Sequence, residues 1–275
     1  MLRILWSSRS AMSAQQEKLD SISNNLSNVN TEGYKRVDVS FKDLVYENLN
    51  RTGNPVTENG SNTSYNGTGI RTGEWVRDNK QGNLTETGVS SNLAIDGQGY
   101  FEVVLPERNP DGSVKTALTR NGNFNLDVNG DLVDDNGNRL NVIFNDNIPL
   151  EERNFTSKNF IIDKEGKIVK NENGNFTEMG KVNLYNVVSQ DSLQSIGKNL
   201  YTVKTYQLNG NTIPVEQPYV TEEAEILQGF SELSNVDMAR EMTDMIITQR
   251  AFELSSRSMK TGDEMWGMAN NLRSR

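Results

Sequence analysis

The sequence predicts a mainly β body of antiparallel hairpins, in one or two small β domains, with N- and C-terminal helices that pair as a coiled coil. Two observations support this fold class. Apolar residues recur every seven positions at both ends of the chain, which is the period of a coiled-coil or helix-bundle seam. Between the ends, short apolar runs are separated by Asn-Gly and Asp-Gly pairs, which are strong hairpin signals.

Residues 1–33 predict an amphipathic helix that ends near Gly33, because glycine commonly terminates helices. Asn24, Asn25 and Asn28 weaken the end of this helix. These asparagines are expected either to hydrogen-bond backbone groups there or simply to terminate the helix. The apolar stripe of the helix consists of Leu5, Met12, Leu19 and Leu26, with Ile22 at a companion position.

Residues 34–80 predict an extended arm or linker. The stretch from Asn50 to Thr72 is rich in Asn, Gly, Thr and Ser, a composition typical of loops and extended segments. Two interpretations remain open for the part from about Arg51 to Gly73. It is either an arm that reaches a neighbouring subunit or an ordinary surface loop.

Residues 81–230 predict the β-rich body. Apolar runs lie on both sides of Asp96-Gly97, Asn129-Gly130 and Glu165-Gly166, so a hairpin is expected at each pair. The body is therefore expected to form an antiparallel meander.

Residues 231–275 predict a second helix, which Ser234 is expected to cap together with Asp237 in a capping box. A helix of roughly 35 residues would be on the order of 50 Å long, which is too long to be buried within a small domain. Its stripe consists of Met238, Met245, Phe252, Met259 and Trp266, with Met242 at a companion position. We expect Met238, Met242, Met245, Phe252 and Met259 to pack against the stripe of the first helix.

The formal net charge of the chain is −9. The two predicted helices are nearly neutral, so the excess acidity lies on the middle of the chain, which argues against a nucleic-acid partner. The chain has no Cys and no His. This composition excludes disulfides, thiolate chemistry, histidine acid–base catalysis and most zinc sites. No stretch is apolar enough to predict membrane insertion or a cleaved signal peptide.

The motifs that could carry chemistry have simpler interpretations. The stretch Asp127–Asp131 resembles the start of a calcium loop, but Leu132 occupies the position that needs glycine, so a hairpin turn is favoured. The carboxylate pairs Asp134-Asp135 and Glu151-Glu152 suit solvated loops better than glycosidase catalysis. The sequence thus predicts no catalytic residues, no cofactor and no metal site.

Several other functions stay open at this point. The first helix could lie on a membrane surface, although its near-zero charge argues against an anionic one. The helices could form an ordinary intramolecular pair. A secreted β adhesin would not need matched stripes at both ends, and no sequence feature favours a peptidoglycan hydrolase.

The segment Asn24–Arg36, with the sequence NNLSNVNTEGYKR, resembles the N-terminal signature of flagellar rod and hook proteins. Other segments resemble the same family in order along the chain, namely Gln81–Leu84, Leu93–Phe101, Thr119–Phe124 and Glu241–Ile246. The resemblance covers most of the chain. Within the family, the length and the segment Ser195–Tyr201 favour the distal branch of the rod proteins, with the proximal branch as the alternative.

The resemblance implies a structural subunit of the bacterial flagellum. Such a subunit would pass through the flagellar export apparatus with unfolded ends and without a cleaved signal peptide. It would then form a hollow helical homopolymer in the basal body, in the periplasm or cell-wall layer, and transmit torque from motor to hook. Its partners would be further copies of itself, neighbouring rod and hook proteins and, as a further candidate, the ring bushing proteins. The two apolar stripes and the three asparagines would form the assembly interface.

Overall fold

The computed structural model describes residues 2–44, 46–49, 64–108, 112, 114–145, 148–149, 155, 160–172, 175–208 and 211–273. The chain divides into two compact units. The helical unit comprises Met1–Asn28, Arg36–Asn79 and Val236–Arg275, and the body unit comprises Val29–Lys35 and Lys80–Asn235. Both ends of the chain therefore belong to one unit, and the middle of the chain forms the other.

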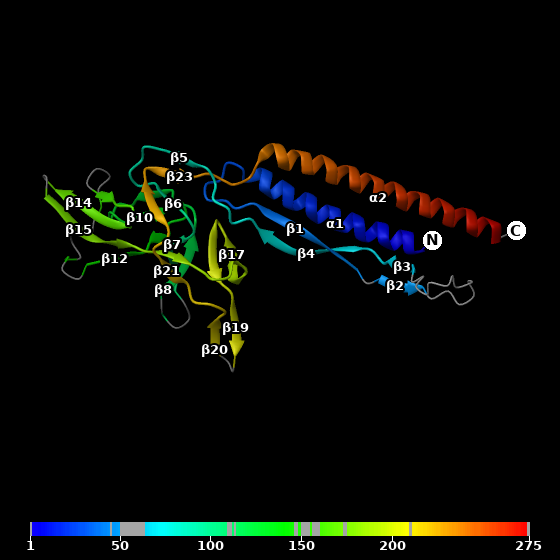
Figure 1. The fold of residues 1–275 in the computed structure, drawn as a ribbon, viewed down its shortest axis with the longest axis horizontal. Coiled ribbons are helices and arrows are strands. Elements are labelled where there is room, and N and C mark those ends of the chain that lie inside the picture. The colour runs from blue at the N-terminus through cyan, green and yellow to red at the C-terminus, as the bar shows by residue number, and fades with distance from the viewer. Residues whose placement is uncertain are drawn as a thin grey trace, which may run out of the picture. The chain divides into compact units, whose positions relative to one another are not determined.

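The helical unit contains two long helices side by side, α1 (Leu2–Ser27) and α2 (Met238–Arg273) (Figure 1). They run antiparallel, because Asn25 near the end of α1 meets Glu241 near the start of α2, and Ser8 meets Ser258. Two antiparallel ribbons belong to the same unit, β1 (Val37–Asp43) with β4 (Ile70–Arg77), and β2 (Tyr46–Leu49) with β3 (Ser64–Gly67). The β1–β4 ribbon packs against α1.

The predicted arm is only partly described by the structure. Residues 50–63 lie outside the described residues, and the stretch that follows forms β3 and β4.

Asp237 caps the N-terminus of α2. Its Oδ1 accepts hydrogen bonds from the backbone amides of Ala239 and Arg240, at 2.9 and 3.3 Å, which a helix would otherwise leave without partners. The expected cap at Ser234 is wrong, because Ser234 lies in the irregular stretch before the helix. The residue predicted as the third position of a capping box is itself the cap.

Hydrogen bonds fix the start of β1 against the last turns of α1. Ser21 Oγ and Asn25 Nδ2 both donate to the carbonyl oxygen of Val37, at 2.7 and 2.9 Å. The amide of Val37 donates in return to Asn25 Oδ1 at 2.9 Å. Ile22, between these two polar residues, is 1% exposed. The inner face of α1 therefore combines one large apolar side chain with polar groups that hydrogen-bond to the backbone of β1.

A nine-stranded antiparallel sheet forms the centre of the body unit, with main path β17-β18-β8-β7-β11-β10-β9 and with β16 joining β7 to β21. Its strands are β7 (Tyr100–Arg108), β8 (Val114–Thr119), β9 (Phe124–Leu126), β10 (Leu132–Asp134), β11 (Arg139–Leu140), β16 (Leu184–Asn186), β17 (Leu193–Gly197), β18 (Leu200–Val203) and β21 (Tyr219–Thr221). A short 3₁₀ helix, η2 (Gln190–Ser192), leads into β17.

A four-stranded antiparallel sheet also belongs to the body unit, in the order β12-β15-β14-β13. Its strands are β12 (Val142–Phe144), β13 (Phe160–Ile162), β14 (Lys167–Glu172) and β15 (Asn175–Val182). Three two-stranded ladders complete the described part, β5 (Leu84–Glu86) with β23 (Phe230–Glu232), β6 (Leu93–Asp96) with β22 (Glu225–Gln228), and β19 (Thr205–Leu208) with β20 (Asn211–Pro214).

Side chains from both larger sheets share one apolar core. Phe101 of β7 and Phe124 of β9 are fully buried there, edge to face with their ring centres 5.6 Å apart, and Ile168 of β14 joins them. Tyr100 belongs instead to a second, smaller cluster with Tyr201 of β18. Because successive residues of a strand point to opposite faces, β7 contributes to both clusters.

Two of the three predicted hairpins are confirmed. β9 pairs with β10 across Asn129-Gly130, and β13 pairs with β14 across Glu165-Gly166. In both turns the glycine has a φ near +80°, whereas Asn129 and Glu165 do not have positive φ. The turns therefore match three-residue loops with a left-handed glycine, and not the two-residue Asn-Gly turn in which both residues have positive φ.

The hairpin expected at Asp96-Gly97 is wrong, because β6 pairs with β22 and β7 pairs with β8. The reason is visible in the buried guanidinium of Arg120. It donates to the carbonyl oxygens of Ile95, Gly97 and Gly99, at 3.3, 2.6 and 2.5 Å. These bonds hold the segment between β6 and β7 in an open bend and not in a tight hairpin turn. The predicted antiparallel meander is therefore only partly right.

Candidate assembly interface

The predicted stripe of α1 is buried unequally in the helical unit. Ile22 is fully buried, and the other stripe residues are half-buried, namely Leu5, Met12, Leu19 and Leu26. On α2 the half-buried stripe residues are Met245, Phe252 and Met259. The structure brings Leu5 and Met259 together in one groove between the helices. Leu5 also lies against Gly262, where an added Cβ would come within 3.0 Å of its side chain.

The first stripe residues of α2 are exposed in the described part of the chain. Met238 and Met242 are 43% and 47% exposed, and Trp266 near the other end is 40% exposed. The buried residue between the two methionines is Glu241. Since one helical residue turns the direction by about 100°, Met242 faces sideways from the helix pair.

The most deeply buried positions of α2 are small or polar, which sequence reasoning missed. Glu241, Thr248 and Gly262 are buried, and Ser255 is half-buried. These four residues are spaced seven apart, so they form a second line with the same period as the methionine stripe. Small residues allow two helices to approach closely. Their equal spacing was the signal that could have revealed this line.

Glu241 lies in a buried network of charged and polar side chains. Its Oε1 is 2.5 Å from Nε of Arg36, and its Oε2 accepts from Asn25 at 3.2 Å. Burial alone would lower the pKa of Arg36, but the hydrogen bond and charge of Glu241 and the charge of Asp38 outweigh it and raise that pKa. A buried carboxylate with such partners is costly to separate from them, so this network fixes the helix pair to β1.

Asp38 extends this network towards α1. Its carboxylate accepts from Nζ of Lys18 and lies 3.2 Å from Arg36. Burial would raise the pKa of Asp38, but the hydrogen bond and charge of Lys18 and the charge of Arg36 hold it below its usual value.

The three predicted asparagines have different environments. Asn25 is buried and bonded to Val37, as described for β1. Asn24 is exposed and Asn28 is half-buried, and Nδ2 of Asn28 donates to the carbonyl oxygen of Asn24 at 2.9 Å. The backbone hydrogen bonds that the sequence predicted at this helix end are therefore present. Their part in assembly stays a prediction.

A second buried ion cluster lies in the body unit. Glu232 accepts from Nζ of Lys35 at 2.5 Å, from Nε of Arg120 at 2.6 Å and from the amide of Gly82 at 2.8 Å. Burial would raise the pKa of Glu232, but the charges of Arg120 and Lys35 and these hydrogen bonds hold it below its usual value. The neighbouring residues Lys35 and Arg36 thus each neutralise a buried glutamate, one in each unit.

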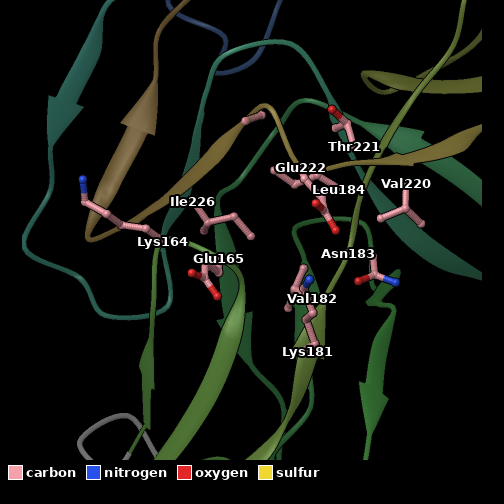
Figure 2. A pocket seen from close by; sticks show the side chains of 11 residues that line it. Lys164, Glu165, Lys181, Val182, Asn183, Leu184, Val220, Thr221, Glu222 and Ile226 are labelled. Carbon is pink, nitrogen blue, oxygen red and sulfur yellow. The ribbon is translucent and has the colours of Figure 1, made fainter.

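The body unit contains a hollow of about 310 Å³ (Figure 2). Two of its charged lining residues are paired within the chain, because Lys164 lies 2.9 Å from Glu225 and Glu165 lies 2.7 Å from Lys167. Its floor includes core side chains such as Ile226. Because Lys164 and Glu165 pair locally and core side chains form part of the floor, we place the candidate functional surface on the helical unit.

Two of the motifs considered for chemistry have structural roles, and the pair Glu151-Glu152 lies outside the described residues. Asp127 accepts from the amide of Gly130 and from Nδ2 of Asn129, which closes the β9–β10 turn. Asp134 is buried and accepts from the amides of Asn136 and Asn138 in the next turn. Within the described residues, no group of three or more acidic side chains is placed to hold a metal ion. Within the same residues, no helix has the length and apolarity needed to cross a bilayer.

Models of protein families match three parts of the chain. Residues 5–35 match the flagella basal body rod protein model, residues 94–183 the flagellar hook protein FlgE/F/G D1 domain, and residues 227–272 the flagellar basal body rod FlgEFG protein C-terminal model. Over 279 residues the chain is 37% identical to the flagellar basal-body rod protein FlgG of Borreliella burgdorferi, covering 99% of both chains.

The chain belongs to the flagellar basal-body rod and hook protein family. Two further relatives support the membership over the full length. The FlgG protein of Buchnera aphidicola subsp. Acyrthosiphon pisum is 38% identical over 96% of this chain and 97% of its own length. The FlgG protein of Bacillus subtilis is 34% identical over 99% and 100%. The flagellar rod family is structural, so the chain is a structural protein and not an enzyme.

The first matched segment contains most of α1 and the last contains most of α2, and each also includes a short part of the body unit, residues 29–35 and 227–235. The middle segment lies in the body unit. The terminal segments of the rod family therefore include both helices, where the predicted assembly residues lie.

Proposed function

We propose that the protein is a subunit of the distal rod of the bacterial flagellum. Copies assemble through their terminal helices into a hollow helical shaft, which transmits torque from the motor to the hook. The observation that carries this proposal is the pairing of helices from opposite ends of a chain that matches FlgG proteins over nearly its whole length. The proximal branch of the rod family is the alternative.

The helix pair supplies the assembly surface. We infer that Leu5, Met12, Leu19, Ile22 and Leu26 of α1 pack as a coiled coil with Met245, Phe252 and Met259 of α2. The flexible thioether side chains of methionine fill irregular spaces, which suits identical subunits in slightly different surroundings. Met238 and Met242 are half-exposed in the chain, so we assign them to contacts with a neighbouring copy. Asn24, Asn25 and Asn28 hold the end of α1 where the chain leaves the helix.

The partners follow from this assignment. The subunit contacts further copies of itself, neighbouring rod and hook proteins and the flagellar export apparatus, with the ring bushing proteins as further candidates. It works in the basal body, in the periplasm or cell-wall layer. The predicted arm from about Arg51 to Gly73 reaches a neighbouring subunit and stiffens the shaft.

Purified hook–basal bodies test the proposal directly. Mass spectrometry of these particles should detect the chain in tens of copies, with a count at the higher end favouring the distal over the proximal rod. Finding the chain only in the soluble fraction, or loose outside the cell, would refute a rod function.

A further inference from the structure

α2 carries a third line of residues with a seven-residue period. Its members come one residue before Thr248, Ser255 and Gly262, so they point about 100° away from the side that faces α1 and lie on one flank of the helix. It consists of Ile247, Leu254, Thr261 and Met268, with Met265 and Leu272 each four residues after a member of the line. The apolar members are strongly exposed, with Ile247 and Met268 at 60%, Leu254 at 65% and Leu272 at 80%. We call these six residues the outer stripe.

The outer face of α1 is different. Its exposed side chains include Arg9, Ser13, Gln16, Asp20 and Ser27, which suit contact with water. A helix that is apolar on more than one face is characteristically buried on each of them, and soluble monomers rarely expose large contiguous apolar patches. The outer stripe therefore marks this flank of α2 as a surface that another molecule covers.

The same unit offers an apolar receptor for such a stripe. A groove of about 590 Å³ lies between α1 and α2 near the N-terminus of α1, with Leu5, Trp6 and Met259 in its lining. Trp6 is largely exposed, and the guanidinium of Arg9 lies 5.5 Å from its ring centre. The groove thus presents apolar surface that the described residues of the chain leave open.

Charged side chains lie beside both the groove and the outer stripe. The rim of the groove carries Arg9, Lys260 and Asp263. Beside the outer stripe lie Arg257 and Glu264, both exposed and seven residues apart. Each surface therefore has both signs of charge. Opposite charges can meet when the stripe enters the groove, and such pairs fix the register of a contact more than its strength.

We propose that the outer stripe of one copy docks in the α1–α2 groove of a second copy. This inference rests on the proposed rod function and names the surfaces that carry it. Stripe and groove are different surfaces of one chain, so the contact is heterologous. A heterologous contact that does not close into a ring continues as an open helical filament, which is the symmetry a shaft requires.

Cross-linking between two single-cysteine chains tests the contact, because the natural chain has no Cys. One chain carries Met268→Cys in the stripe and the other carries Lys260→Cys at the groove rim. Both are produced together in cells that lack the natural chain, and isolated rods are treated with a short bismaleimide. We expect dimers that contain one chain of each kind. Replacing Lys260→Cys by Ser13→Cys, on the polar face of α1, should reduce the dimer yield at least tenfold.

Two results would overturn the inference. Dimers formed equally well by Met268→Cys alone would mean that stripe meets stripe in a symmetric contact. Intact rods without mixed dimers would mean that the stripe does not dock in the groove. Absence of the unaltered chain from hook–basal bodies would instead refute the proposed rod function, so the two failures are distinguishable.

A substitution gives an independent readout. Leu254→Lys changes an exposed side chain, so the thermal unfolding of the free chain should stay unchanged. The number of rods per cell should fall at least tenfold. The matched control Ser13→Lys adds the same charge to the outer face of α1 and should leave that number unchanged. Normal rod numbers with Leu254→Lys would contradict the proposal.

Discussion

The two units of this protein differ in what they bury and what they expose. The body unit has fully buried large apolar side chains, such as Leu93, Phe101 and Phe124. In the described part of the helical unit, Ile22 is the one large apolar side chain below 2% exposure, while Glu241 and Asn25 are equally buried. The body thus satisfies its own apolar surface, whereas the helices keep much of theirs outside.

This difference separates the two tasks of a self-assembling subunit. Burial of apolar surface is the main favourable contribution to folding, so the body can be stable in a free chain. The helices have unpaired apolar surface left over, and contacts with other copies would supply the missing burial. Stability and assembly should therefore respond to mutations in different units.

The largest expected effect is loss of assembly with the body intact. Leu19→Asp or Met245→Asp places a charge in the half-buried helix pair, where its desolvation is costly. Rods should be absent from cells, while the near-UV circular dichroism of the body tyrosines stays unchanged. Ser13→Asp, on the exposed face of α1, is the matched control and should assemble normally. Normal rod yield from either seam variant would remove the helix pair from the assembly mechanism.

A core truncation should have the opposite pattern. Phe101→Ala removes a fully buried ring, and we expect the free energy of unfolding of the body to fall by about 3–5 kcal/mol. Urea titration followed by tyrosine circular dichroism measures this change. Phe176→Ala, at a largely exposed ring, should change it by less than about 0.5 kcal/mol. Equal losses from the two variants would show that the body core is not where the structure places it.

The buried ion cluster of the body predicts a further loss. Glu232→Gln leaves the charges of Lys35 and Arg120 buried without a counter-charge, which should cost about 3 kcal/mol of stability. The matched control is Glu225→Gln, which removes an exposed ion pair with Lys164 and should lower the stability much less, because solvent screens exposed pairs. Similar small values for both would mean that water reaches Glu232.

The same glutamate predicts how stability depends on pH. Its pKa is lowered in the folded chain, so the unfolded chain binds a proton more readily. Its contribution is therefore complete above the ordinary glutamate pKa of about 4.3 and is lost as the pH falls through the lower folded-state value. Urea midpoints measured from pH 6 down to pH 3 should fall more steeply for the natural chain than for Glu232→Gln. Parallel pH profiles would contradict this assignment.

The smallest expected effect concerns the start of α2. Asp237→Ala removes the cap and should cost about 1 kcal/mol. The three tryptophans, Trp6, Trp75 and Trp266, all belong to the helical unit, so tryptophan fluorescence reports its unfolding. The tyrosine signal of the body should not change.

Local features of this chain could be predicted from the sequence, and distant partners could not. The heptad stripes and the turn glycines Gly130 and Gly166 are local patterns, and both helices and two hairpins follow from them. The pairing of β6 with β22 joins segments about 130 residues apart, and the neighbouring strand β7 was the nearer but wrong candidate. No local pattern distinguishes these two partners.

The candidate interface shows the same limit. Burial of Glu241 depends on its ion pair with Arg36, 205 residues earlier in the chain. The seven-residue period contains no sign of that pair, so it favoured Met238 and Met242 as residues that face α1. The seven-residue period was right, but three lines on α2 share it. Which line faces α1 is decided by close approach at Gly262 and by the ion pair at Glu241. The sequence pattern alone does not show which of the three lines faces α1.

The β9–β10 turn offers a practical handle for microscopy. Val128 at its tip is fully exposed, and exposed turn tips tolerate substitutions and insertions better than any other part of a fold. A Val128→Cys chain would carry one thiol, since the natural sequence has none. A fluorophore attached there would label the body and leave the helices untouched, so the growth of single rods could be followed in living cells.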